Sequence, residues 1–72
     1  MKSEKVARAF GKALKGRRNE AGLSQIALAE HSDLDRTYIS LLETGRRQPS
    51  LAAFLALARA IGVRPATLLS DT

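Results

Sequence analysis

The sequence predicts an all-α fold built from five short helices around one core. Apolar residues recur at steps of three and four along most of the chain, and no window alternates apolar and polar residues as a strand would. Glycine and proline interrupt this pattern at Gly22, Gly45, Pro49, Gly62 and Pro65. The 72 residues, 44% of them apolar, are therefore expected to form one small domain, 1–72.

The first helix is expected to begin after Ser3, which suits an N-cap, and to end before Gly22. Glu4 then lies in the first turn, where the helix dipole favours an acid. The apolar face of this helix is predicted to contain Val6, Phe10, Ala13, Leu14 and, at its edge, Arg17. A basic stripe lies on another face, formed by Lys5, Arg8, Lys12 and Lys15. This stripe is either a solvated surface or a second surface for nucleic acid or membrane.

Residues 24–44 are expected to form two helices joined by the turn 32–34. Ser24 caps the second helix, which packs through Ile26, Leu28 and Ala29. Asp35 caps the third helix, 36–44, which buries Ile39 and Leu42 and stops at Gly45. Each helix is too short to be stable alone, so both must pack against the rest of the domain.

Two further helices follow the loop 46–49, because Pro49 disfavours a helical conformation for the residue before it. Ser50 caps the fourth helix, and Gly62 stops it. Its apolar positions are Leu51, Phe54, Leu55, Ala58 and Ile61. Pro65 suits the first turn of a short fifth helix that contains Leu68 and Leu69.

Composition and charge narrow the range of functions. A net charge of +5 on so short a chain favours a polyanionic partner, most simply nucleic acid. There is no cysteine, so no disulfide or thiolate metal site is expected, and no metal or cofactor is predicted. The single histidine, His31, directly precedes Ser32 and Asp33, and adjacent residues cannot adopt catalytic-triad geometry. An enzyme is therefore not expected.

No apolar run is long enough to span a bilayer, and the first residues lead into no apolar signal segment. The sequence therefore predicts a cytoplasmic protein that associates with DNA and not with a membrane.

The third helix has a polar outer face. At 100° per residue, the outward positions are Thr37, Ser40, Leu41 and Thr44, with Arg36 and Tyr38 beside them. A polar and basic helix face opposite an apolar stripe is suited to the major groove of double-stranded DNA.

Each of these side chains has a predicted role. Arg36 can bond a guanine through O6 and N7, or hold a phosphate without reading sequence. Thr37 and Ser40 can bond base edges, and Leu41 either meets a thymine methyl group or is simply an exposed leucine. Tyr38 is expected to pack its ring against the second helix and to send its hydroxyl to a phosphate; the alternative is core packing alone.

The stretch from Leu23 to Gly45, followed by 46–50 and 57–63, closely resembles the lambda-repressor-like, Cro/C1-type (XRE family) helix-turn-helix proteins. The resemblance covers about residues 14–69, and it implies a compact five-helix DNA-binding domain with its helix-turn-helix at about 24–44. The run 34–40, Leu-Asp-Arg-Thr-Tyr-Ile-Ser, also resembles the recognition helix of restriction–modification controller proteins.

Two residues depart from the family pattern. Asp33 stands where the family commonly has glycine, so it is expected to adopt a left-handed conformation. Ala27 replaces the glutamate that often completes a capping box with the serine cap. Neither residue belongs to the predicted DNA-facing set.

The resemblance also implies roles outside the third helix. It assigns Gln25, at the start of the second helix, to the DNA backbone, where free amides and the helix dipole also favour a phosphate. Ser24 either shares that phosphate or acts only as a cap. Arg18 and Glu43 match positions that pair in many family members and join the third helix to the first. The loop residues Arg46, Arg47 and Gln48 are expected to lie along the DNA backbone. The alternative is that the two arginines are simply solvated charges.

The predicted function is a sequence-specific transcriptional regulator that binds an inverted-repeat operator as a homodimer. The dimer surface is expected on the fourth and fifth helices, with the candidates Phe54, Arg64, Pro65, Leu68 and Leu69. For Phe54 and Leu68 a place in the core remains the alternative. An antitoxin-like subunit whose main partner is another protein is the alternative function, and a non-specific nucleic-acid binder is the third.

Overall fold

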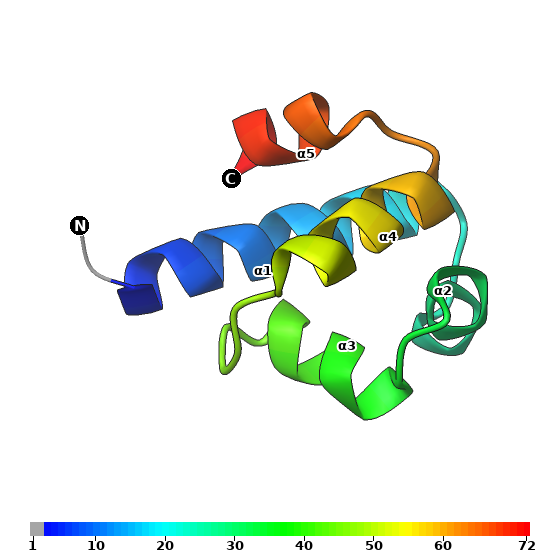
Figure 1. Ribbon diagram of the computed structural model, residues 1–72, viewed down its shortest axis with the longest axis horizontal. Coiled ribbons are helices and arrows are strands. Elements are labelled where there is room, and N and C mark those ends of the chain that lie inside the picture. The colour runs from blue at the N-terminus through cyan, green and yellow to red at the C-terminus, as the bar shows by residue number, and fades with distance from the viewer. Residues whose placement is uncertain (1–2) are drawn as a thin grey trace.

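The computed structural model describes residues 3–72, and within them five helices follow one another without a strand. These helices are α1 (Ser3–Glu20), α2 (Gln25–Ser32), α3 (Arg36–Glu43), α4 (Leu51–Ile61) and α5 (Pro65–Asp71). In Figure 1, α1 and α4 cross the middle of the molecule, α3 lies on one side of them and α5 on the other. The predicted all-α fold of five helices is confirmed.

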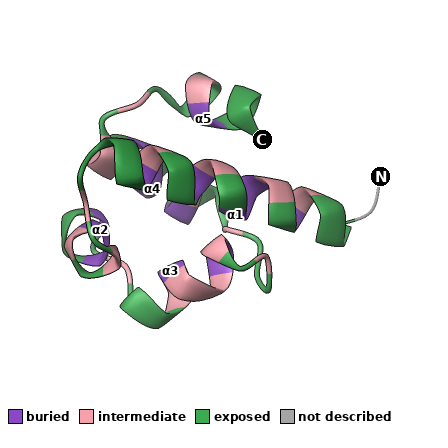
Figure 2. Cartoon of the chain, turned by 180° about the vertical axis from the view of Figure 1, so that it is seen from behind, coloured by how far each residue is buried: buried purple, intermediate pink, exposed green. Residues whose placement is uncertain are grey.

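All five helices contribute to one core. The side chains that are fully buried are Leu14, Leu28, Ile39, Leu42, Leu57 and Leu68. Figure 2 shows that burial is confined to the inward face of each helix, as expected for short amphipathic helices. Leu68 is thus a core residue, and its candidacy for a dimer surface is wrong.

Local capping sets the helix boundaries where the sequence predicts them. The side chains of Ser24, Asp35 and Ser50 accept hydrogen bonds from backbone N–H groups two or three residues later, at 3.0, 2.9 and 3.1 Å. Asp33 ends α2 in the left-handed conformation, with φ 58° and ψ 35°, as its place in the turn requires. Small differences occur at two ends, since α1 begins at Ser3 itself and α3 stops at Glu43, with Thr44 as its C-cap.

Three of the apolar positions predicted to pack are instead exposed. Ile26 on α2 is 57% exposed, Leu51 is 74% exposed and Leu55 is 43% exposed. The helices α2 and α4 bury other residues, Leu28 and Ala29 in one and Ala53, Leu57 and Ala58 in the other. An apolar stripe wider than the contact face leaves its edge residues in solvent.

Among residues 3–72, no single helix is long and apolar enough to cross a membrane. The helices α4 and α5 reach the required length and hydropathy only when taken together, and they meet at a bend of 102°.

Candidate nucleic-acid interface

The helix α3 presents one face to the core and the other to solvent. Ile39 and Leu42 are buried, whereas Arg36 and Thr37 are exposed at the N-terminal end. Ser40 and Leu41 are half-buried on the outward side. The outward face is therefore polar at its start, with one apolar side chain, Leu41, in its middle.

Thr44 is exposed and forms the C-cap of α3. Its hydroxyl donates to the carbonyl oxygens of Ser40 and Leu41, at 3.0 and 3.2 Å. The hydroxyl proton of Thr44 is thus engaged by backbone carbonyl groups of α3, and its oxygen remains free only to accept a hydrogen bond.

A buried ion pair joins α3 to α1. The Nε and Nη2 atoms of Arg18 donate to Glu43 at 2.6 and 3.0 Å, and only 10% and 3% of the two side chains are exposed. The remaining Nη1 of Arg18 donates to the carbonyl oxygen of Leu23 at 2.8 Å, in the turn before α2. The hydrogen bonds to Glu43 raise the pKa of Arg18 above its already high value, so the guanidinium stays charged although burial opposes it.

The side chain of Gln25 also reaches this ion pair. Its Nε2 donates to Oε1 of Glu43 at 3.1 Å. The sequence places Gln25 at the DNA backbone, and the structure places it at the first position of α2, half-buried, with its amide held by α3. Helical spacing alone could not show this contact, since the two residues lie 18 positions apart.

Tyr38 lies against the segment that follows α3. Its hydroxyl oxygen accepts a hydrogen bond from the backbone N–H of Ser50 at 3.2 Å, and the guanidinium of Arg47 lies 5.6 Å from the centre of its ring. The ring packs against the core, and the polar contacts of Tyr38 are with the N-cap of α4 and the loop before it. The hydroxyl proton is still able to donate to a phosphate.

The loop after α3 carries exposed polar and basic side chains. Arg46, Arg47 and Gln48 are all exposed, and Gln48 donates to the carbonyl oxygen of Ser3 at 3.4 Å. Arg47 is the one of the two arginines that stacks on Tyr38. The loop is therefore braced by both α1 and α3. The basic stripe of α1 is exposed at all four of its positions, Lys5, Arg8, Lys12 and Lys15.

These features define the class of protein. Two short helices meet across a left-handed turn, and the second presents a polar outward face beside a basic loop. Its one acid, Glu43, is buried and neutralised by Arg18, so it does not repel a polyanion. The protein is a helix-turn-helix DNA-binding regulator.

Comparison with known proteins gives the family. The helix-turn-helix domain family matches residues 9–70. The control protein C.MunI of a Mycoplasma species is 41% identical over 63 residues, which cover 86% of this chain and 85% of that protein. The crystal structure of the restriction–modification controller protein C.AhdI from Aeromonas hydrophila has a TM-score of 0.85 and 41% identity, covering 88% of this chain and 96% of that one. The chain belongs to the helix-turn-helix family of transcriptional regulators.

The similarity to controller proteins covers most of the chain and not only residues 34–40. A second relative, the immunity repressor protein of Bacillus phage phi105, is 34% identical over 61 residues. That match covers 85% of this chain but only 42% of the repressor.

Proposed function

We propose that the protein binds an inverted-repeat operator as a homodimer and regulates transcription from it, with α3 of each copy in the major groove. The observation that carries this proposal is the outward face of α3, polar at its N-terminal end and fixed to α1 by the Arg18–Glu43 ion pair. The controllers similar to this chain support it. The protein would act in the cytoplasm, by binding rather than by catalysis.

The exposed N-terminal end of α3 is the proposed reader of base sequence. Arg36 would bond a guanine bidentately, and Thr37 and Ser40 would bond neighbouring base edges. Leu41 would contact a thymine methyl group, which gives an apolar side chain on this face a partner.

The surrounding groups would hold the DNA backbone. Gln25 and the N-terminus of α2 would bind one phosphate. Others would be bound by the hydroxyl of Tyr38 and by the loop residues Arg46, Arg47 and Gln48. Such contacts carry no sequence information themselves, but they place α3 in register with the bases. Six to ten of them per dimer would lower the affinity about 10³–10⁵-fold between 50 and 200 mM salt.

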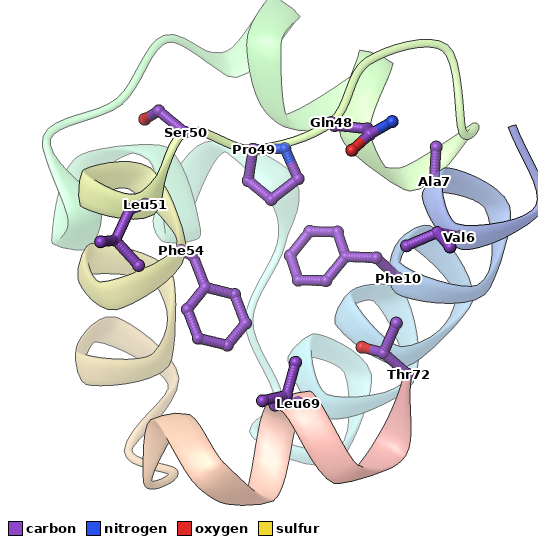
Figure 3. Close-up of a pocket in the computed structure, with 10 residues that line it drawn as sticks. All are labelled: Val6, Ala7, Phe10, Gln48, Pro49, Ser50, Leu51, Phe54, Leu69 and Thr72. Atoms are coloured by element: carbon purple, nitrogen blue, oxygen red, sulfur yellow. The ribbon is translucent and has the colours of Figure 1, made fainter. Parts of the chain in front are cut away.

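An apolar groove supports dimer formation through α4 and α5. It has a volume of 390 Å³ and is lined mainly by apolar side chains of α1, α4 and α5 and of the segment before α4. Figure 3 shows the rings of Phe10 and Phe54 facing this hollow, with Pro49 and Leu69 on either side. Phe54 is half-buried and lies 5.9 Å from Phe10 between ring centres, so it forms part of the groove wall.

The same surface also carries protruding leucines. Leu51 and Leu69 line the groove and are 74% and 65% exposed. A two-fold axis brings the same patch of both copies together, so the protruding leucines of one copy can enter the apolar hollow of the other. An inverted repeat requires such a two-fold axis, with half-sites about 34 Å apart. A second copy of this chain is therefore the occupant we propose.

The same groove also favours the second candidate function, a subunit whose main partner is a different protein. The two functions differ in their response to DNA. Steep salt dependence with preference for one sequence is expected of the regulator, and monomer instability relieved by another protein is expected of the interaction subunit.

The test is selection from a library of random DNA duplexes, run with the wild type and with the double variant Arg36→Ala, Thr37→Ala. A two-fold symmetric motif that is lost or relaxed in the variant is the expected result. Binding without any enriched sequence, by a folded wild-type protein, would refute the proposal and direct attention to a protein partner.

A further inference from the structure

The start of α2 holds a set of N–H groups that the protein itself leaves without acceptors. Within residues 3–72, the backbone N–H groups of Gln25 and Ile26 donate to no protein atom, as is usual at the first positions of a helix. The N–H of Ala27 is already used by the Ser24 hydroxyl. The amide side chain of Gln25 lies at this same end, and one of its two N–H groups is used by Glu43.

The bond to Glu43 decides which way this amide faces. An amide side chain has a donor end and an acceptor end, and a carboxylate can only accept. Glu43 therefore selects the orientation in which the Gln25 nitrogen points inward to α3, 3.1 Å from Oε1 of Glu43. The same nitrogen keeps a second N–H, which is directed away from the first and remains for an outside acceptor.

Glu43 is itself held without freedom to turn. Arg18 binds both of its oxygens, at 2.6 and 3.0 Å, and binds the carbonyl oxygen of Leu23 with its third nitrogen. Because only 3% of the Glu43 side chain is exposed, water does not compete for these hydrogen bonds. One cluster thus connects α1, the turn before α2, the first residue of α2 and the last residue of α3.

We propose that Glu43 is a positioning residue for the DNA backbone: it orients the Gln25 amide so that the second N–H donates to a phosphate at the N-terminus of α2. This inference rests on the proposed DNA contact of Gln25. It gives the Arg18–Glu43 pair a second role beyond holding α3 to α1, because the pair determines the direction of a hydrogen bond that neither residue makes. A purely structural pair would affect all DNA contacts alike.

The test measures the contact at a single phosphate. Each phosphate of the selected duplex is replaced in turn by a neutral methylphosphonate, and the dissociation constant is measured for each protein. In the wild type, one replacement near the N-terminus of α2 is expected to weaken binding about tenfold, the size of one hydrogen bond to a charged group. In Gln25→Met that replacement is expected to have a clearly smaller effect, because only the backbone N–H groups then remain to bind the phosphate, and this reduction identifies the phosphate.

The decisive variant is Arg18→Met, Glu43→Met. It keeps the net charge and replaces the ion pair by apolar side chains, a change that folded proteins often tolerate well. Its sensitivity at the phosphate that Gln25→Met identifies is expected to fall to the level seen in Gln25→Met, while its sensitivity at the other phosphates is kept. Glu43→Gln is the converse control, because it retains an acceptor for Gln25 but leaves Arg18 without its charge partner. It is expected to melt at a lower temperature than the apolar variant and yet to keep the phosphate contact.

Full sensitivity of the apolar variant at that phosphate would overturn the positioning role. If the apolar variant does not fold, Gln25→Asn tests the same link, because the shorter amide cannot reach Glu43 and a phosphate together. Retention of the contact in Gln25→Asn overturns the proposal. An unchanged phosphate pattern in Gln25→Met refutes the Gln25 contact while DNA binding stands, and failure of the wild type to select any sequence refutes the proposed function itself.

Discussion

A β-carbon on Gly11 would lie 2.5 Å from the carbonyl oxygen of Leu42. It would also lie 2.7 Å from the carbonyl oxygen of Glu43, so α1 meets the end of α3 backbone to backbone. This contact lies beside the Arg18–Glu43 ion pair, which joins the same two helices. The helix α3 is therefore joined to α1 by one close backbone contact and one buried ion pair.

Gly11→Ala should destabilise the protein even though alanine is the better helix former. Both atoms that the new methyl group would meet belong to backbone, so α3 must shift, and overpacking of this kind costs about 1–3 kcal/mol. Gly16 provides the control in the same helix, because nothing lies within 4 Å of the position of its β-carbon. Gly16→Ala is expected to raise the free energy of unfolding by about 0.5–1 kcal/mol. Urea unfolding of both variants checks this, and shifts of the same sign would contradict it.

The buried and the exposed ion pairs should differ in importance. Glu43→Ala leaves the Arg18 charge buried without a partner, and the expected loss is about 3–5 kcal/mol of unfolding free energy together with weaker DNA binding. Asp71→Ala removes the pair that joins α5 to α1, in which Arg17 Nε lies 2.6 Å from the carboxylate. That pair is solvated, so its loss should change stability far less. Thermal unfolding of the two variants decides, and an equal loss would show that burial does not distinguish them.

The Arg17–Asp71 pair should also give stability a dependence on acid pH. The hydrogen bond that Arg17 donates to Asp71 holds the pKa of this carboxyl below the ordinary aspartate value of about 4. Because this pKa is lowered in the folded state, the pair stabilises the protein fully at a pH above the ordinary aspartate pKa. This stabilisation is lost as the pH falls through the lower pKa of the folded state. The difference in unfolding free energy between the wild type and Asp71→Asn should be constant above about pH 5 and shrink in stronger acid. A difference that grows on acidification would contradict the assignment.

The local features of the fold could be predicted from sequence because they depend on neighbouring residues. Ser24, Asp35 and Ser50 cap helices with N–H groups two or three positions away, and the left-handed Asp33 follows from its place in the turn. The inner face of α3 follows from helical spacing in the same way, with Ile39 and Leu42 fully buried.

The features that sequence reasoning missed are contacts between distant segments. The bond of Gln25 to Glu43 and the close approach of Gly11 to α3 depend on how helices cross, which periodicity does not determine. Apolar character also does not separate core from surface, as Leu51 and Leu68 show: one is 74% exposed and the other fully buried. The one sequence signal for this close approach was the presence of a glycine, Gly11, on the buried face of a predicted helix.

Arg36 and Arg46 should affect DNA binding in different ways. Both are exposed arginines, so Arg36→Ala and Arg46→Ala remove the same charge. Loss of a bidentate guanine contact by Arg36 should cost about 1–3 kcal/mol on the selected operator and relax preference at one base pair per half-site. Loss of a phosphate contact by Arg46 should weaken binding to all sequences alike and reduce the salt slope by about one. Titrations of operator and scrambled duplexes at several salt concentrations measure both effects, and a uniform effect of Arg36→Ala would make it a phosphate contact instead.

Charged substitutions on the apolar groove should separate the two copies of the proposed dimer. Leu51 and Leu69 are already exposed, so Leu51→Glu and Leu69→Glu leave the core intact while placing four like charges across a two-fold interface. Ile26→Glu is the matched control, because Ile26 is 57% exposed and lies on α2, away from the groove. In sedimentation experiments without DNA, the double variant is expected to be monomeric and Ile26→Glu dimeric, with unchanged helical content in both. A double variant that stays dimeric would exclude this groove as the interface. A wild type that is monomeric at micromolar concentration would instead favour a different protein as the occupant of the groove.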